Sequence, residues 1–405
     1  MPPFPATPGR SLRLHSLDAL RGLDMLIILG LDSLVLLLAS RAPGNAFLHE
    51  AARQMTHARW EGLHLYDLVF PVFVFISGVS LSFSLAKYTG GRAAVTPGFL
   101  HLWKRAFALA FLGLLVNGTL TWTEDMRYAS VLGLIGFSCA IAGTCVLLCR
   151  RTGAIAAAAA GIPALIALLQ FTCGSFTPDG SVNSWVDTHW LPGRLHGGVF
   201  DPEGPLCILS ASALCMGGWL AGKFLKESRM PPVRLCMAMM GAGILLFCAA
   251  VMLEGVYPII KSMWTGTFVL AAAGISLMLL SLSHLAIDVW NGGKWAKWAF
   301  PFRVIGVNAL AAYLIHALLN VHELNRRIFS GMADFFPPFQ PVFLAVSLLL
   351  LQWLALLFLY RRHVSFAKNP DKSRHGGISG HDSPLNIPGP DYPSGANEEK
   401  RGFPM

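Results

Sequence analysis

Residues 264–284 read WTGTFVLAAAGISLMLLSLSH and contain no Asp, Glu, Lys or Arg. About 20 consecutive, predominantly apolar residues are enough to cross the hydrocarbon core of a bilayer as one helix. Comparable runs recur along almost the whole chain, so we expect an all-α, polytopic integral membrane protein with about ten transmembrane helices. The predicted helices lie near residues 19–39, 65–86, 99–116, 129–149, 153–171, 204–222, 233–253, 264–284, 303–319 and 341–360.

The composition of the 405-residue chain agrees with a membrane protein. Hydrophobic residues make up 54% and charged residues 13%, which is about half the charged fraction of a typical soluble domain. A soluble enzyme, a disordered protein and a disulfide scaffold are therefore excluded. The 8 Cys residues form no CxxC pair, which argues against a structural zinc site or a redox pair. The first run is too polar for a signal peptide, because Asp18, Asp24 and Asp32 interrupt it.

The Lys and Arg residues predict the topology. The net charge is +9, and most of the 31 basic residues fall in cytoplasmic segments if the N-terminus is placed inside, as the positive-inside rule requires. We therefore predict two cytoplasmic termini, and we attribute the basic excess to topology and not to nucleic-acid binding. Three segments follow: a cytoplasmic N-terminal segment (1–14), a transmembrane domain (15–363) and a disordered cytoplasmic tail (364–405) rich in Pro, Gly, Ser and charge.

The first predicted helix carries four ionisable residues. Such side chains are costly inside a membrane and are functional candidates by default. Asp18, Arg21, Asp24 and Asp32 fall on one broad face of a regular helix, with Asp32 almost in line with Arg21. A salt-bridged stripe between helices explains Asp18 and Arg21. It explains Asp32 poorly, because Asp32 lies in the outer half of the helix with no cation near it in sequence.

A second polar set precedes the run VFPVFVFISG (69–78). The spacing places His57, Trp60, His64 and Asp67 on one face of a continuous helix. A His at the outer rim of the bundle can act as a base, and a nearby carboxylate would fix its tautomer. The alternative is an interfacial belt of aromatic and His residues. That alternative is enough to explain His64, whereas for His57 and Asp67 it and a catalytic role explain the sequence equally well. No HExxH-type pair occurs, so we expect no metal.

The predicted outside loop 172–203 concentrates Trp, His, Gly and carboxylate residues. An aromatic face beside carboxylates suits a sugar with hydroxyl or amino groups, and Asp187 and His196 are candidates for such contacts. For Asp201 and Glu203 the simpler alternative is capping of the next helix, because carboxylates are favoured at the N-cap and in the first turn.

Three more polar residues follow later in the chain. Asn308 and His316 are about two turns apart and within roughly 80° around a helix, so both can face one cavity. Alternatively, each makes a hydrogen bond between helices. Lys261 is one of few cations predicted outside, where it would neutralise an anion or extend its amine to the interface.

Taken together, these residues resemble a known family. Over about residues 15–366 the chain resembles the transmembrane acyltransferases related to heparan-α-glucosaminide N-acetyltransferase, which include bacterial members. Five blocks occur in the same order as in that family. They are SLDALRG (16–22), HxxWxGxxxxDLxFPxFxFIxG (57–78), DPEG (201–204), PIxKxxWT (258–265) and GxNxxxxYxxH (306–316).

The resemblance implies an enzyme that moves an acetyl group from cytoplasmic acetyl-CoA to an amino sugar on the opposite side of the membrane. The family's proposed active-site His corresponds to His57, which forms an acetyl-His intermediate or acts as the base in direct transfer. Asp32 stands where the glucosaminide enzyme has Asn, and an Asp would also stabilise charge on His57. The lumenal N-terminal domain of that enzyme lies outside the resemblance, so heparan sulfate is not expected as the substrate.

Our first hypothesis is an acyltransferase of the bacterial inner membrane, embedded in the lipid bilayer, with acetyl-CoA as donor and a glycan or amino sugar as acceptor. His57 would be the base or acyl carrier, oriented by Asp32 and Asp67. Asn308 and His316 are candidates for contacts with the thioester carbonyl or the acceptor. The candidates for binding the phosphates of CoA are Arg21, Lys104, Arg105 and Arg303. The candidates for binding the acceptor are Trp60, Asp187, His196, Asp201, Glu203 and Lys261. The alternatives are a proton-coupled secondary transporter of sugars or small peptides, and a structural or assembly protein. A homodimer is a candidate assembly.

Overall fold

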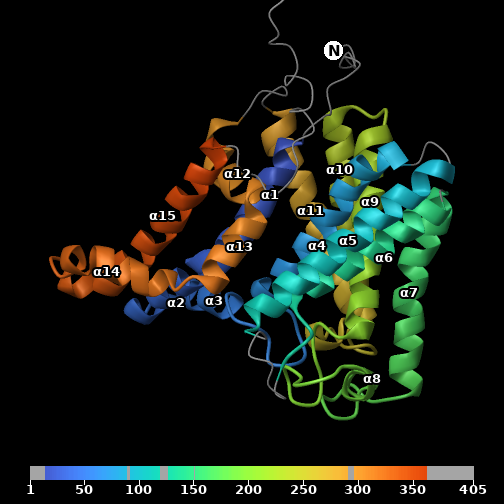
Figure 1. Ribbon diagram of the computed structural model, residues 1–405, viewed down its shortest axis with the longest axis horizontal. Coiled ribbons are helices and arrows are strands. Elements are labelled where there is room, and N and C mark those ends of the chain that lie inside the picture. The colour runs from blue at the N-terminus through green and yellow to red at the C-terminus, as the bar shows by residue number, and fades with distance from the viewer. Residues whose placement is uncertain (1–13, 89–91, 119–125, 150, 291–295, 363–405) are drawn as a thin grey trace, which may run out of the picture. The chain divides into compact units, whose positions relative to one another are not determined.

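The computed structural model describes residues 14–88, 92–118, 126–149, 151–290 and 296–362 (Figure 1). Its regular elements in these ranges are helices, accompanied by two isolated β-bridges, so the predicted all-α class is confirmed. The α-helices are α1 (His15–Leu26), α2 (Asp32–Arg41), α3 (Ala46–Gln54), α4 (Val69–Ser84), α5 (Arg92–Val116), α6 (Val131–Cys149), α7 (Thr152–Thr172), α8 (Val182–Trp190), α9 (Pro205–Glu227), α10 (Pro232–Leu253), α11 (Gly266–Ser283), α12 (Phe300–Val307), α13 (Ala309–Leu318), α14 (Val321–Ala333) and α15 (Gln340–Arg361). The predicted tail 364–405, and all of the predicted segment 1–14 except Leu14, lie outside the described residues.

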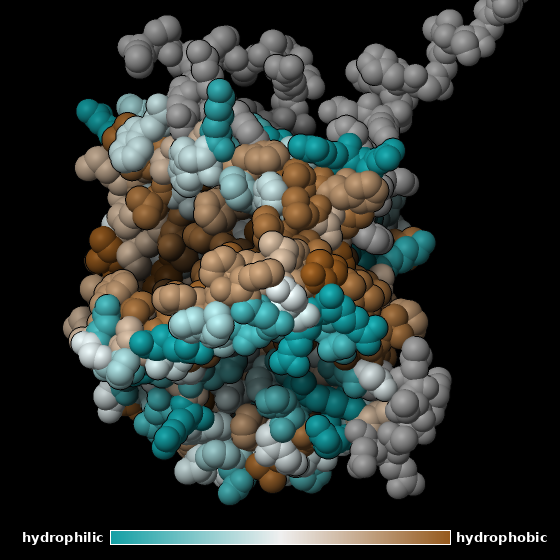
Figure 2. Space-filling model, turned by 90° about the vertical axis from the view of Figure 1, so that its left-hand side faces the viewer, coloured by the Kyte–Doolittle hydropathy of each residue, from teal (hydrophilic) through white to brown (hydrophobic). Residues whose placement is uncertain are grey.

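The described helices include the predicted membrane spans. Nine are long and apolar enough to cross a bilayer, and one bent pair makes a tenth candidate. The nine are His15–Arg41, Leu65–Tyr88, Val95–Val116, Val131–Cys149, Thr152–Thr172, Pro205–Glu227, Pro232–Leu253, Gly266–Val289 and Pro337–Arg361. Figure 2 shows an apolar band between two hydrophilic zones on the face that it presents. The chain is therefore an integral membrane protein with several spans.

The first span is not a regular helix. Residues Ile27–Leu31 form a π-helical segment between α1 and α2, and within it Gly30 has a φ of 126°. That conformation is open to glycine and strained for other residues. The prediction that Asp32 lies in line with Arg21 along one regular helix is therefore wrong, because the break changes the rotation of α2 relative to α1.

The tenth candidate span is broken at Asn308. Lys297–Val307 and Ala309–Leu318 meet at an angle of 62°, and Asn308 itself has non-helical backbone angles. The expectation that Asn308 and His316 lie two turns apart on one helix is wrong for this reason. After α13, helix α14 runs across the direction of α13 and α15 before the chain re-enters the bundle (Figure 1).

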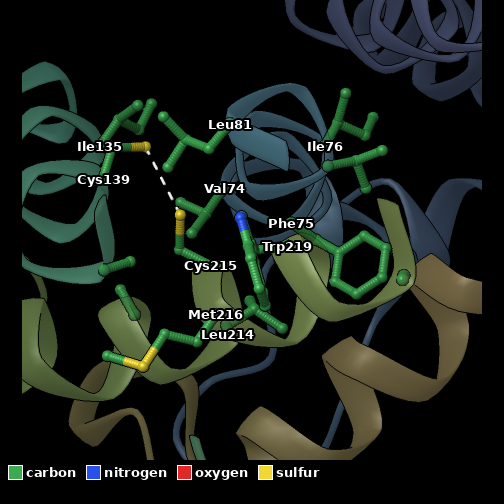
Figure 3. Packing of buried hydrophobic residues seen from close by; sticks show 14 of the residues in the cluster. Val74, Phe75, Ile76, Leu81, Ile135, Cys139, Leu214, Cys215, Met216 and Trp219 are labelled. Atoms are coloured by element: carbon green, nitrogen blue, oxygen red, sulfur yellow. Dashed lines mark hydrogen bonds between the residues drawn. The ribbon is translucent and has the colours of Figure 1, made fainter. Parts of the chain in front are cut away.

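Glycines allow α4 and α9 to approach closely. A Cβ atom on Gly78 would lie 2.0 Å from the Cys215 carbonyl oxygen, and one on Gly218 would lie 2.0 Å from the Phe75 carbonyl oxygen. Small residues permit such backbone contact between membrane helices. Fully buried side chains, including Val74 and Ile76 of α4, fill the space around this contact (Figure 3).

Three segments between the long helices gather at one end of the bundle, which we call the loop end: residues 42–64, which contain α3, residues 173–204, which contain α8, and residues 254–265. They are joined directly. Glu61 forms a β-bridge with Ile260, and the Gly62 N–H donates to the Ile259 carbonyl over 2.9 Å. The Trp60 indole N–H donates to the Phe176 carbonyl over 2.7 Å. The loop end is therefore an ordered surface on which residues distant in sequence meet.

Candidate active site

His57 and Asp67 meet at the loop end, although they do not lie on a helix together. α3 ends at Gln54, and a short 3-10 turn, Leu65–Leu68, precedes α4. Between them the chain reverses at Gly62, whose φ is 105°. The predicted continuous helix over residues 57–67 is therefore wrong, but the reversal brings the His57 Nδ1 atom to 2.7 Å from Asp67 Oδ1.

The Asp67 carboxylate organises this reversal. Its Oδ2 atom accepts the backbone N–H groups of Ala58, over 3.1 Å, and of His64, over 3.0 Å. Its Oδ1 atom faces His57. Asp67 is 1% exposed, and a buried carboxylate needs such partners to remain charged. The fold of residues 57–67 therefore depends on the same carboxylate that orients His57.

Lys261 completes a cluster of three charged or titratable groups. Its Nζ atom lies 2.9 Å from His57 Nδ1 and 3.4 Å from Asp67 Oδ1. Burial lowers the pKa of Lys261, whereas the neighbouring Asp67 and Glu203 carboxylates oppose that shift. The sequence predicts that Lys261 contacts the acceptor; in the structure its amine lies against His57 and Asp67 and 6.0 Å from the centre of the Phe70 ring. Because the amine lies against His57 and Asp67, Lys261 neither extends into water nor stands as an isolated cation.

The His57 side chain remains open to solvent on one side. It is 48% exposed, whereas Asp67 is almost completely buried. The Tyr66 ring packs edge-on against the imidazole, with the ring centroids 4.7 Å apart. Its phenol interacts with the Asp32 carboxylate. Among the described residues Asp32 therefore reaches His57 through Tyr66, and not by the direct contact that was expected.

A second charged cluster lies in the same end of the molecule and is centred on Arg127. The guanidinium binds Asp201 through two hydrogen bonds, of 2.8 and 2.7 Å, and also binds Glu203. Burial disfavours the ionised form of Asp201, but Arg127 outweighs it and holds the Asp201 pKa below its ordinary value. Burial raises the pKa of Glu203. Arg127 was not selected from the sequence, where it was only one of several outside cations.

Asp187 is the third carboxylate of this cluster. Its Oδ2 atom accepts the Asp201 backbone N–H over 2.9 Å, and its buried Oδ1 atom has no hydrogen-bond partner among the described residues. Burial raises the pKa of Asp187 to about 7. A Cβ atom on Gly204 would lie 2.1 Å from Oδ1, so the close approach requires glycine at position 204.

The capping alternative for Asp201 and Glu203 is wrong. Helix α9 begins at Pro205, its N-cap residue is Gly204, and no side chain caps it. The Asp201 carboxylate instead accepts the backbone N–H groups of His196 and Glu203, at 3.0 and 3.1 Å, in addition to Arg127. It therefore holds the loop before α9 together.

The two clusters are close enough to interact electrostatically. Lys261 and Tyr313 both experience the charge of Glu203, and His196 experiences the charge of His57. Desolvation and the nearby Arg127 lower the pKa of His196. Trp60 joins this region by packing edge-on against Phe200, with the ring centroids 5.1 Å apart. The loops that carry Trp60, His196 and Glu203 therefore lie near His57 and Lys261 at the loop end.

The residues predicted to bind CoA lie on three helices, α1, α5 and α12. Arg21 lies 3.8 Å from Asp18 and donates to Ser80 over 3.0 Å, in agreement with the salt-bridge interpretation. Arg303 packs over the Tyr360 ring at 5.9 Å, on helix α12, which packs against α1. Lys104 and Arg105 are exposed on α5, which packs mainly against α6.

Asn308 and His316 make contacts between helices. The Asn308 amide donates to the carbonyls of Val304, at 3.0 Å, and Leu356, at 3.4 Å. His316 Nδ1 lies 3.1 Å from the Gln352 side chain. No group of three or more His, Cys, Asp or Glu residues that could hold a metal ion occurs in the described parts of the chain.

Comparison with known proteins gives a distant relation. No family model matches the chain. It is 22% identical over 370 residues to the heparan-alpha-glucosaminide N-acetyltransferase of Mus musculus, which covers 76% of this chain and 54% of that protein. It is 22% identical over 367 residues to the Homo sapiens protein of the same name, covering 75% and 52%. The chain thus spans about half the length of the curated relatives it matches. The resemblance inferred from the five sequence blocks is confirmed: this chain is distantly similar to a transmembrane acetyltransferase.

Proposed function

We propose that the protein is a membrane-bound acyltransferase that moves an acyl group, most simply acetyl, from cytoplasmic acyl-CoA to an amino or hydroxyl group of an extracytoplasmic sugar. The observation that carries this proposal is the His57–Asp67 pair, in which a buried carboxylate orients a half-exposed imidazole at the loop end. The distant relation to a membrane N-acetyltransferase supports the same chemistry. The bacterial inner membrane is the proposed location.

In the proposed reaction, His57 donates its Nδ1–H to Asp67 and presents the Nε2 lone pair to the acceptor. Nε2 takes the proton of the attacking amine or hydroxyl, the acceptor forms a bond to the thioester carbon, and the C–S bond to CoA breaks. Alternatively, Nε2 attacks the thioester first and passes the acyl group on. General base catalysis of this kind contributes about 10²–10⁴-fold to a rate.

The residues around His57 suit an acceptor with hydroxyl or amino groups. Asp187 and Glu203 supply carboxylates, His196 and Lys261 supply donors, and Trp60 supplies an aromatic ring at this end of the bundle. Asp201 is fully buried and bound by Arg127 and two backbone N–H groups, so we assign it to holding the loop. For Asn308 and His316 the contacts to neighbouring helices favour a structural role. At the opposite end, Arg21 and Arg303 on the packed helices α1 and α12 are the better-supported pair for the phosphates of CoA, with Lys104 and Arg105 as further candidates.

One observation favours the second candidate function, a proton-coupled transporter. Asp24 lies inside the first span and is 6% exposed, and its Oδ2 atom has no hydrogen-bond partner among the described residues. Intramembrane carboxylates of this kind occur in proton relays of transporters. The extracytoplasmic His57–Asp67 pair has no role in that function, so the acyltransferase accounts for more of the structure.

The test uses purified protein in detergent, labelled acetyl-CoA and a panel of amino sugars. The native chain should transfer label to at least one sugar, and His57→Ala should abolish transfer. His49→Ala is the matched control, because His49 is an exposed residue of α3 whose ring lies 3.1 Å from the Pro43 carbonyl oxygen. Label trapped on His57 without acceptor would select the acetyl-His route. A near-normal rate in His57→Ala would overturn the assignment.

A further inference from the structure

The Nδ1 atom of His57 faces two competing partners. Asp67 Oδ1 lies 2.7 Å away and Lys261 Nζ lies 2.9 Å away. A neutral imidazole has one nitrogen that donates and one that accepts, so Nδ1 cannot donate to the carboxylate and accept from the ammonium at the same time. Lys261 Nζ also lies 3.5 Å from Nε2, farther than from Nδ1. Only when Nδ1 donates to Asp67 does Nε2 carry the lone pair that a base or nucleophile needs.

We propose that Lys261 is a positioning residue whose ammonium group keeps His57 neutral, with the proton on Nδ1 and the lone pair on Nε2. The proposal rests on the proposed function of His57. It follows from the charges at the site: a buried Asp67 carboxylate without a compensating cation would draw a second proton onto His57 and hold it as imidazolium. Lys261 offsets that negative charge and repels the additional proton.

The Lys261 side chain is held in place by the loop that carries it. The backbone next to it is tied to residues 61 and 62 by the Glu61–Ile260 bridge and the Gly62–Ile259 hydrogen bond. Trp264, three residues after Lys261, adopts a left-handed conformation with a φ of 47°. Lys261 is only 20% exposed as a side chain, and its amine lies 6.0 Å from the centre of the Phe70 ring. The amine is therefore not free to leave His57 for water.

The other charged groups around His57 do not replace Lys261. His196, in the loop before α9, interacts electrostatically with His57. Glu203 interacts with Lys261, and Arg127 interacts with His196, so both are one residue farther from His57. Asp32 acts through Tyr66. Among the described residues, Lys261 is the cation that lies within 4 Å of both His57 and Asp67. Its removal should therefore change the protonation of His57 more than removal of any of these groups.

The test measures the protonation of His57 without any substrate. Diethylpyrocarbonate reacts with neutral imidazole, and mass spectrometry of the His57 peptide gives the rate at each pH. In Lys261→Met the midpoint of this profile should move to higher pH by about one unit or more, and the acid limb of acetyl transfer should move with it. At a pH below the midpoint, a one-unit shift lowers both rates about tenfold.

Two variants separate charge from structure. Lys261→Arg keeps the cation and should show the native midpoint. Lys223→Met removes a partly exposed cation of α9 that pairs with Glu227, and this variant should also show the native midpoint. An unchanged or lowered midpoint in Lys261→Met, or a shift of equal size in Lys261→Arg, would overturn the proposal. A raised midpoint in a chain that transfers no acetyl group would support the role of Lys261 and overturn the proposed function.

Discussion

At the scale of single residues, Asp67 links the local fold to the proposed chemistry. One carboxylate oxygen accepts two backbone N–H groups from residues 58 and 64, and the other faces His57 and Lys261. This arrangement leaves no spare lone pair for a substrate. Asp67 is therefore a residue that orients His57, and its replacement should affect turnover more than acceptor binding.

Asp67→Asn is expected to lower kcat of acetyl transfer about 10²-fold with little change in KM. The Asn oxygen can still accept the two backbone N–H groups, but its amide would donate to His57 Nδ1 and leave the proton on Nε2. Initial rates over a range of acceptor concentrations measure this split. Glu50→Gln removes an exposed carboxylate of α3 that pairs with Arg53 and should behave as the native chain. A kcat within about twofold of native in Asp67→Asn would contradict the orienting role.

Asp187 makes stability depend on pH. Its pKa is raised to about 7 by burial, whereas an Asp in the unfolded chain titrates near pH 4. Between these values the folded chain holds one more proton than the unfolded chain, so its free energy of unfolding decreases as pH rises from about 4 to 7, by up to about 1.4 kcal/mol per pH unit. Above pH 7 the contribution is constant.

Asp187→Asn should therefore flatten the fall of Tm with pH in thermal unfolding between pH 5 and pH 8. Asp179→Asn, at an exposed position of the same loop, should retain the native slope. A slope that is the same in all three chains would mean that Asp187 does not titrate in this window.

At the scale of elements, the contact of α4 with α9 fixes the part of the bundle nearest the site, because α4 follows Asp67 directly. The contact depends on glycine at positions where any side chain would meet the backbone of the other helix. The same device occurs where α1 meets α12: a Cβ atom on Gly22 would lie 1.7 Å from the Phe302 carbonyl oxygen. Helix positions in this bundle are therefore set by backbone contact as well as by side-chain packing.

Gly78→Ala should destabilise the protein by about 1–3 kcal/mol, because the added methyl group forces α4 and α9 apart. Gly217→Ala is a matched control on α9, since nothing lies within 4 Å of the position where its Cβ would be built. It should be neutral or slightly stabilising through helix propensity. Thermal unfolding in detergent compares the two, and equal Tm values for both variants would contradict the close-contact account.

The helices could be predicted from the sequence because apolar length is a strong local signal, but their interruptions could not. The break at Gly30, the bend at Asn308 and the reversal at Gly62 lie in or beside sequences that fit regular helix geometry. A contact with a residue distant in sequence accompanies each of them: Gln352 donates to the Leu29 carbonyl, Asn308 to the Leu356 carbonyl, and the Gly62 N–H to the Ile259 carbonyl. Predictions of shared helix faces failed at these places for that reason.

The same distinction applies to the site. His57, Asp67 and Lys261 could be selected from sequence because ionisable residues are sparse in this chain. Their contact could not, because Lys261 lies 204 positions from His57 along the chain. Arg127 carried no local signal at all, since its importance comes from the carboxylates of Asp201 and Glu203 more than 70 positions away.

At the scale of the whole molecule, the apolar band of Figure 2 and the ten candidate spans describe a chain that reaches both sides of a membrane. Two exposed native cysteines report the sidedness, because they flank α7: Cys149 ends α6 just before α7, and Cys173 follows α7 directly. A membrane-impermeant maleimide should label Cys173 in intact spheroplasts and Cys149 only after permeabilisation. Labelling of Cys149 first would invert the predicted topology.

Sided proteoliposomes provide the decisive experiment for acyl transfer across the membrane. Labelled acetyl-CoA is supplied only on the cytoplasmic face and an amino-sugar acceptor only on the loop-end face. Labelled, acetylated sugar should appear on the acceptor side with the native chain, and none should appear with His57→Ala. Uptake of unmodified sugar by the vesicles, with no acetylated product on either side, would contradict it.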